Sequence, residues 1–249
     1  MVYSLKNWQG KLAVVTGVTA GIGEEITVQL IKAGVNVLGL ARRKERLDLL
    51  TNRLKNENGK FYAFVADVSK EDDILKAFLW AEENIGAVHI LINNAGVRKR
   101  TNLVEGDTNL WKEVFDTNVL GLCIATREAF KSMKKHNVSG HIIHINSIVG
   151  HTVVYLPQSS VYPASKFAVT ALTETLRQEL NAIGSKIKVT SISPGYVDTE
   201  FRKASNLETT NELLSLKSED VADAVLYALG TPSHVQVHEI IIKPIGETF

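Results

Sequence analysis

Residues 12–23 read LAVVTGVTAGIG, a short apolar run followed by a turn that contains three glycines. The run 12–16 has the length and the β-branched content of a buried strand. Glycines at positions 17, 21 and 23 let the backbone bend sharply and approach a ligand without a Cβ in the way. A helix that begins here points free N–H groups and its positive dipole end at the turn, which favours a pyrophosphate. The segment predicts a nucleotide-binding turn, although a purely structural turn is the alternative.

Six further apolar runs follow, separated by stretches with helical spacing. The expected strands cover residues 12–16, 35–40, 61–66, 88–93, 141–146, 188–193 and 239–243, and the expected helices cover residues 22–33, 44–57, 72–85, 110–135, 165–183 and 218–229. This alternation predicts an α/β fold, a Rossmann-type doubly wound parallel sheet of about seven strands flanked by helices. Short loops indicate a single domain over residues 1–249. The weakly periodic stretch 199–216 is expected to cover a substrate.

The overall composition gives little reason to expect a nucleic acid or membrane partner. Lys and Arg number 28 and Asp and Glu number 27, so no basic surface is implied. The single cysteine, Cys123, cannot form an intrachain disulfide, and the seven histidines lack metal-ligand spacing, so we expect no metal. Neither a signal peptide nor a membrane-spanning run is visible. We therefore expect a cytoplasmic protein.

The end of the second expected strand indicates which dinucleotide binds. The strand is followed by Arg42, Arg43 and Lys44, and no acidic residue occurs before Glu45. An acid at this place would bind a free ribose 2′-hydroxyl, whereas arginine binds a 2′-phosphate through paired hydrogen bonds. The pattern favours NADP(H) over NAD(H), and a solvated helix start is the alternative.

Polar residues after two later strands, and on the helix that follows the second of them, supply the elements of a proton-transfer site. Asn94 follows the fourth strand, Ser147 follows the fifth, and Tyr162 and Lys166 are four residues apart on the next helix. A lysine cation lowers the pKa of a nearby tyrosine, which is otherwise about 10. The serine can hold a substrate oxygen near the tyrosine hydroxyl while a nicotinamide cofactor carries the hydride. Pro163 is tolerated only near a helix start, so this helix is expected to begin at Ser160 or Val161.

The order of these motifs resembles that of the short-chain dehydrogenase/reductase family over essentially the whole chain. The resemblance rests on T-G-x-x-x-G-I-G, N-N-A-G, Asn118, Ser147, Y-x-x-x-K and P-G-x-V-x-T. It implies that Ser147 orients the substrate oxygen, Tyr162 is the general acid/base, Lys166 tunes the tyrosine and holds the nicotinamide ribose, and Asn118 anchors a relay water.

The resemblance also implies the remaining cofactor contacts. Asp67 and Val68 match adenine contacts, Asn94 and Ala95 flank the adenosine, and residues 194–199 match the clamp on the nicotinamide amide. The complete expected set is Gly17, Thr19, Gly21, Ile22, Gly23, Arg42, Arg43, Asp67, Val68, Asn94, Ala95, Tyr162, Lys166, Pro194, Gly195, Val197 and Thr199. One departure is a slightly long spacing from Ser147 to Tyr162, which places residues 151–160 in a distinctive pocket wall.

The substrate expectation comes from a finer resemblance. Residues 37–47, 162–174 and 193–199 (VLGLARRKERL, YPASKFAVTALTE and SPGYVDT) resemble the branch of NADP-dependent farnesol dehydrogenases of insects, whose vertebrate relatives reduce 3-keto and 17-keto steroids. The implied substrate is an apolar alcohol or its aldehyde or ketone, with a farnesol-type isoprenoid preferred over a steroid or a broad range of carbonyls. Ser147 and Tyr162 would contact it, with an apolar lining from Val153, Val154, Leu156, Tyr196, Phe201 and Leu207, unless these side chains serve only in packing.

Several other interpretations of the sequence carry less weight. Residues 98–100 (Arg-Lys-Arg) are interpreted as a solvated loop, although they could meet an anionic group, and His151 could touch substrate. A non-catalytic NADP-sensing protein would be expected to lack the tyrosine or the lysine, and both are present. The resemblance implies a homodimer or homotetramer.

Overall fold

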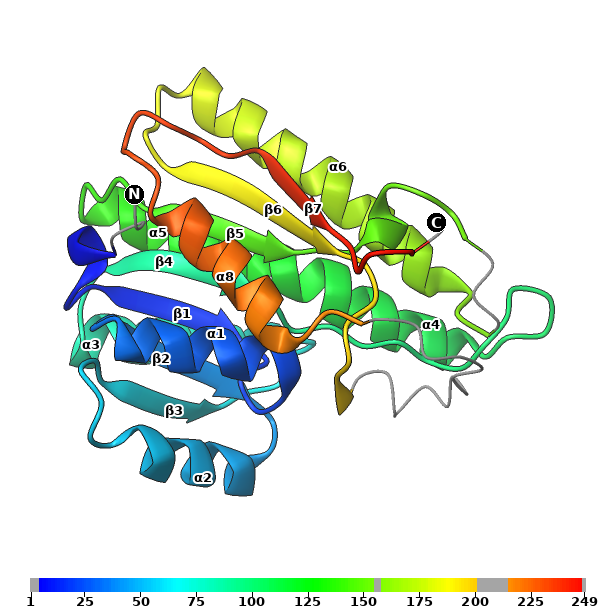
Figure 1. The fold of residues 1–249 in the computed structure, drawn as a ribbon, viewed down its shortest axis with the longest axis horizontal. Coiled ribbons are helices and arrows are strands. Elements are labelled where there is room, and N and C mark those ends of the chain that lie inside the picture. Colours follow the sequence, from blue (N-terminus) through cyan, green and yellow to red (C-terminus); the bar gives the residue numbers. More distant parts are fainter. Residues whose placement is uncertain (1–4, 155–157, 201–214, 248–249) are drawn as a thin grey trace.

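The computed structural model describes residues 5–154, 158–200 and 215–247. The seven expected strands form one parallel sheet with the order β3-β2-β1-β4-β5-β6-β7 (Figure 1). Each strand end lies within one residue of its predicted position. The strands are β1 (Leu12–Thr16), β2 (Asn36–Ala41), β3 (Phe61–Val65), β4 (Val88–Asn93), β5 (His141–Ile145), β6 (Lys188–Pro194) and β7 (Glu239–Ile242).

Helices cover both faces of the sheet (Figure 1). The core on one face includes side chains of α1 (Gly21–Lys32), α2 (Lys44–Leu54) and α8 (Ser218–Leu229). The core on the other includes side chains of α3 (Glu71–Asn84), α5 (Gly121–Lys135) and α6 (Val161–Ala182). Successive side chains of β1 alternate between these two cores, as the pleat of a strand requires. The near-continuous apolar runs of the central strands follow from this burial on both faces.

The expected single helix over residues 110–135 is wrong. The chain instead forms α4 (Thr108–Phe115), a five-residue π-helical turn (Asp116–Leu120) and then α5. A π turn widens the helix by one residue, which a 3.6-residue pattern does not reveal. The turn contains the buried Asn118, so the irregularity lies at an expected site residue. By contrast, α6 begins at Val161, which confirms the inference drawn from Pro163.

The strand order determines where a ligand can bind. The chain reverses its direction of travel across the sheet between β1 and β4, which are hydrogen-bonded neighbours. Ligands of open parallel sheets bind outside the carboxyl ends of the strands at such a switch point. Gly17 follows the end of β1 and Asn94 follows the end of β4, so both predicted motifs lie there. Within the described part of the chain, no helix is long and apolar enough to span a membrane.

Candidate active site

The glycine turn after β1 has a backbone that other residues would disturb. Gly17 and Gly21 have φ angles of +76° and +56°, in the left-handed region that favours glycine. A Cβ at Gly23 would lie 2.4 Å from the carbonyl oxygen of Gly17. These glycines therefore keep the turn tight at the start of α1, with its N-terminus directed at the carboxyl edge of the sheet. The shape suits the close approach of a pyrophosphate.

Asn94 braces this turn from the neighbouring strand. Its Nδ2 donates to the carbonyl oxygens of Thr16 and Gly17 at 2.9 and 3.2 Å, and its backbone N–H donates to the Thr16 hydroxyl at 3.0 Å. The backbone N–H of Ala95 donates to the same hydroxyl, also at 3.0 Å. The Asn94 amide nitrogen thus fixes the turn, and the expected adenosine contacts of Asn94 and Ala95 stay predictions.

Cationic side chains gather at the start of α2. The side chain of Arg42 is 65% exposed, and within the described residues its Nη1 forms one ion pair, at 3.9 Å, with Oδ2 of Asp67. Arg43 reaches the glycine turn, where its Nη2 donates to the hydroxyl and carbonyl oxygens of Thr19 at 3.0 and 3.1 Å. Arg46, on the next turn, donates to the same carbonyl at 3.4 Å. The tight glycine turn allows backbone N–H groups to approach a phosphate, and several guanidinium groups lie nearby. Together these features fit a dinucleotide that carries a 2′-phosphate.

The predicted adenine contacts follow β3. Partial burial raises the pKa of Asp67, but two hydrogen bonds from Ser69 and the charge of Arg42 outweigh it, so the net pKa is lowered. Asp67 therefore remains an acceptor at neutral pH. Val68 is buried beside it, against Gly121 at the start of α5.

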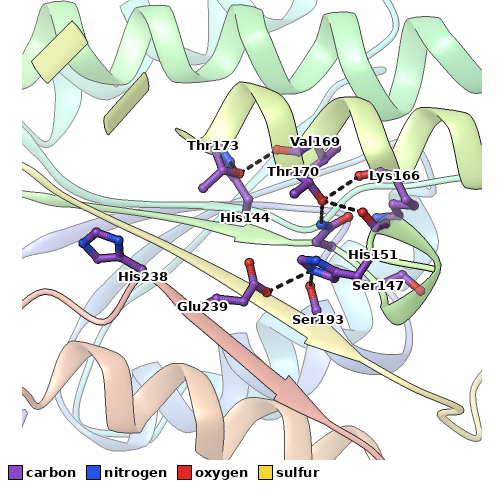
Figure 2. A network of polar contacts seen from close by, with 12 residues as sticks. His144, Ser147, His151, Lys166, Val169, Thr170, Thr173, Ser193, His238 and Glu239 are labelled. Carbon is purple, nitrogen blue, oxygen red and sulfur yellow. Dashed lines mark hydrogen bonds and ion pairs between the residues drawn. The ribbon is translucent and has the colours of Figure 1, made fainter. Parts of the chain in front are cut away.

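Ser147 lies two residues after the end of β5 and caps a short 3₁₀ turn, Ile148–Gly150. This turn is held against α6 by Thr170, whose hydroxyl lies 2.9 Å from the carbonyl oxygen of Gly150 (Figure 2). The same hydroxyl accepts a hydrogen bond from Nδ2 of Asn146 at 2.8 Å. These contacts set the position of Ser147 relative to the helix that carries the tyrosine.

Tyr162 and Lys166 project from the first two turns of α6 towards this position. The side chain of Ser147 is hydrogen-bonded to Tyr162. Lys166 Nζ lies 5.9 Å from the centre of the Tyr162 ring and donates to the carbonyl oxygen of Ile145 at 2.9 Å. The structure therefore brings Ser147, Tyr162 and Lys166 together, as the sequence predicted.

Burial shifts the pKa values of both Tyr162 and Lys166. Burial raises the pKa of Tyr162 to about 12, against the lowering effects of the Ser147 hydrogen bond and the positive charge of Arg98. Burial also lowers the pKa of Lys166 to about 8. The protein's own groups leave the pKa of Tyr162 above its usual value of 10, because desolvation of the phenolate outweighs the lowering effects. The further lowering by the cationic nicotinamide of an oxidised cofactor stays a prediction.

Arg98 is a component of this site that the sequence interpretation placed in a solvated loop. Lys99 and Arg100 do point outward, to Glu113 and to Gln158. Arg98 is instead partly buried, and burial lowers its pKa while the charge of Tyr162 raises it. Its position two residues after the N-N-A-G motif, at the carboxyl edge of the sheet, was the available signal.

Asn118 has a positioning role in the structure. Its Oδ1 accepts from the backbone N–H of Val97 at 2.8 Å, and its Nδ2 donates to the Val97 carbonyl and to the Ser165 hydroxyl, both at 3.0 Å. Ser165 in turn donates to the carbonyl of Tyr162 at 2.7 Å. Asn118 thus links the loop after β4 to α6, the helix that carries Tyr162. The relay water expected at Asn118 stays a prediction.

His151 joins the 3₁₀ turn to the last two strands (Figure 2). Its Nε2 lies 3.0 Å from the hydroxyl of Ser193 and 3.5 Å from Oε1 of Glu239. The ring is therefore engaged with the sheet.

The segment after β6 is held by contacts with Glu247 and with Leu216. The backbone N–H of Tyr196 donates to Oε2 of Glu247 at 2.9 Å, and a Cβ on Gly195 would lie 2.3 Å from the same carboxylate oxygen. Val197, two residues before the expected cover segment 199–216, forms a parallel bridge with Leu216 at the end of that segment. A Cβ on Gly21 would lie 3.1 Å from the Thr199 methyl group, so this segment also lies against the glycine turn.

A family model described as short chain dehydrogenase matches residues 11–210. The chain belongs to this family. It is 53% identical to the "Farnesol dehydrogenase" of Aedes aegypti over 98% of this chain and 100% of that protein. It is 42% identical to human "Dehydrogenase/reductase SDR family member 11" over 96% of each chain. The protein is therefore an oxidoreductase of the alcohol and carbonyl class.

Solved structures support the same assignment. An archaeal alcohol dehydrogenase from Thermococcus sibiricus, complexed with 5-hydroxy-NADP, has a TM-score of 0.85 and 27% identity, covering 96% of this chain and 98% of that one. The closed form of a serine dehydrogenase complexed with NADP⁺ has a TM-score of 0.86 and 31% identity, covering 96% of each chain. Both matches extend over nearly the whole short-chain dehydrogenase fold.

Three of the six residues predicted to line the substrate pocket lie within the described part of this short-chain dehydrogenase. Tyr196, which follows β6, and Val154 are partly buried, and Val153 is 76% exposed next to the 3₁₀ turn. The remaining expected lining residues Leu156, Phe201 and Leu207 lie outside the described residues. The apolar lining therefore stays a prediction.

Proposed function

We propose that the protein is an NADP(H)-dependent dehydrogenase that interconverts an apolar alcohol and its aldehyde or ketone, with a farnesol-type isoprenoid alcohol as the preferred substrate. The observation that carries this proposal is the meeting of Ser147, Tyr162 and Lys166 at the sheet edge that also holds the glycine turn. The 53% identity to a protein named farnesol dehydrogenase supports the substrate class.

The cofactor would lie across the carboxyl edge of the sheet. The glycine turn would hold the pyrophosphate at the N-terminus of α1, and Arg42 with Arg43 would hold the 2′-phosphate. Residues 194–199 would contact the nicotinamide. When bound, NADP(H) supplies or accepts the hydride.

The protein's own groups would manage the proton and the substrate oxygen. The Ser147 hydroxyl donates a hydrogen bond to the substrate oxygen and keeps it beside the hydroxyl of Tyr162. In reduction, Tyr162 donates its proton to that oxygen, and in oxidation it removes the proton of the alcohol. Because the pKa of Tyr162 is about 12, the phenol is protonated at neutral pH, which is the form that reduction requires. Lys166, when protonated, places a positive charge near the phenolate formed by that transfer.

Absorbance of the reduced nicotinamide tests this proposal directly. Purified protein would be given NADP⁺ or NAD⁺ with farnesol, geraniol, simple secondary alcohols and hydroxysteroids, and the reverse reaction would use the matching aldehydes and ketones. We expect turnover of farnesol with NADP⁺. Turnover of steroids alone would move the substrate to the steroid class, and cofactor binding without turnover would favour a non-catalytic sensor.

A further inference from the structure

Every nitrogen of the Arg43 guanidinium already has a partner in this structure. Its Nε donates to the Thr19 hydroxyl at 3.2 Å, and its Nη2 donates to the hydroxyl and carbonyl oxygens of Thr19. Its Nη1 donates to Oε2 of Glu200 at 3.3 Å. A guanidinium has five N–H groups, so these contacts leave little capacity for another anion.

The same carboxylate oxygen is shared with a second arginine. Nη1 of Arg46 lies 2.7 Å from Oε2 of Glu200. The hydrogen bond from Arg46, and then that from Arg43, keep the pKa of Glu200 low despite the opposing effect of burial. One negative oxygen therefore lies between two guanidinium groups, and both groups also contact the carbonyl of Thr19 in the glycine turn.

Glu200 reaches this place from a distant part of the chain. It follows Thr199, which packs against Gly21 and belongs to the segment expected to contact the nicotinamide. Its side chain is 54% exposed, and those of Arg43 and Arg46 are 45% and 41% exposed. Ion pairs that are this open to water are weak, so a more highly charged anion can replace the carboxylate.

We propose that the Glu200 carboxylate occupies the anion position between Arg43 and Arg46, so that the 2′-phosphate of NADP(H) has to displace it to bind both arginines. This inference rests on the proposed binding of a 2′-phosphorylated cofactor. NAD(H) lacks the phosphate and leaves the carboxylate in place. Glu200 is then a specificity-determining residue that reduces the preference for NADP(H) below what the arginines alone would give.

Binding of two nucleotide fragments tests the proposal without turnover. 2′,5′-ADP and 5′-AMP differ only by the 2′-phosphate, and their dissociation constants would be measured by calorimetry for the wild type and for Glu200→Gln. We expect the variant to bind 2′,5′-ADP more tightly by about two-fold to ten-fold, the range given by removing two exposed ion pairs, with 5′-AMP unchanged. Glu45→Gln, which removes an exposed charge from the first turn of α2, is the matched control and should change neither constant.

Two other results would overturn the proposal. Weaker binding of 2′,5′-ADP by Glu200→Gln would mean that the carboxylate braces the arginines for the phosphate, and unchanged binding of both fragments would mean that it has no influence on the site. Adding Arg43→Gln gives an independent check. This substitution should cost more affinity for 2′,5′-ADP in the Glu200→Gln background than in the wild type, and equal losses would contradict competition.

The same data separate this proposal from the cofactor assignment. If wild-type protein binds 2′,5′-ADP no better than 5′-AMP but Glu200→Gln does, the NADP(H) preference is wrong and the competition is supported. If neither protein distinguishes the fragments, both proposals fail. A wild-type preference for 2′,5′-ADP that Glu200→Gln leaves unchanged supports the cofactor and overturns the role of Glu200.

Discussion

The ammonium group of Lys166 donates a hydrogen bond to the carbonyl oxygen of Ile145 across 2.9 Å. Ile145 ends β5 two residues before Ser147, and Lys166 lies one helical turn after Tyr162. A single hydrogen bond therefore connects the two segments that carry the proton-transfer groups. It also places a lysine charge in the interior, where Lys166 is only 6% exposed and burial lowers its pKa to about 8.

This buried lysine should reduce stability at neutral pH. The pKa of Lys166 is about 8 in the folded chain and 10.5 when unperturbed, so the unfolded state binds more protons between these values. The free energy of unfolding should therefore rise as the pH increases from about 8 to about 10.5. Lys166→Met should abolish this rise and, at pH 7, stabilise the fold by on the order of 1–2 kcal/mol after the lost hydrogen bond is counted. Urea denaturation of both proteins at several pH values measures these free energies of unfolding. A Lys166→Met variant that is less stable than the wild type at pH 7 would contradict the prediction.

Replacing the tyrosine tests the acid/base assignment. Tyr162→Phe removes the hydroxyl that is proposed to exchange a proton with the substrate oxygen, so kcat should fall by about 10² to 10⁴-fold. NADPH binding, followed by nicotinamide fluorescence, should change little because the ring remains. Tyr227→Phe on the surface of α8 is the control and should keep full activity. Retained turnover by Tyr162→Phe would remove the assignment.

Arg98 should influence the pH dependence of oxidation. Its positive charge lowers the pKa of Tyr162, so Arg98→Gln should raise that pKa further and leave less of the base form at any given pH. We expect kcat/KM for alcohol oxidation at pH 9 to fall by roughly three-fold to ten-fold, with the rising limb of the pH profile displaced to higher pH.

Two neighbouring variants make this experiment specific. Lys99→Gln and Arg100→Gln remove the same charge from side chains that point to Glu113 and Gln158, and both should keep the wild-type profile. If all three variants shift the profile equally, the effect is one of general surface charge and Arg98 has no particular role.

The choice of cofactor depends on Arg42 in our proposal. Arg42→Asp replaces a donor to the 2′-phosphate with a repelling charge, so NADPH affinity should fall by about 10-fold to 100-fold while NADH affinity changes little. Fluorescence titration of both cofactors measures this difference. Equal losses for the two cofactors would show that Arg42 does not contact the 2′-phosphate.

The strands and the catalytic group were predictable because local sequence determines them. The apolar runs of β1 and β4 are buried on both faces, and this burial leaves a continuous signal. Tyr162 and Lys166 share a helix face through their spacing, and Pro163 marks the start of that helix. Parallel strands then bring Ser147 to the same edge.

The features that the sequence did not predict depend on distant contacts. The π turn around Asn118 adds one residue to a helix without changing its composition. Arg98 is partly buried in a loop held by long-range contacts, from Asn118 to Val97 and from Ser159 to Thr101. Arg43 meets Glu200 across 157 positions of sequence, a pairing that no local pattern contains.

The bridge between Val197 and Leu216 joins the two ends of the intervening stretch, which the sequence predicts to cover the substrate. Both residues lie at the base of the intervening stretch, so its ends stay at one place on the sheet whatever sequence connects them. The entropy of closing such a loop changes slowly, by about 0.6 kcal/mol for each doubling of its length. Changes of length between Glu200 and Leu216 should therefore cost little stability, while β6 and α6 remain in register. If this stretch covers the substrate, as the sequence predicts, replacing it with that of a relative should change the substrate range and leave the proton-transfer group in place.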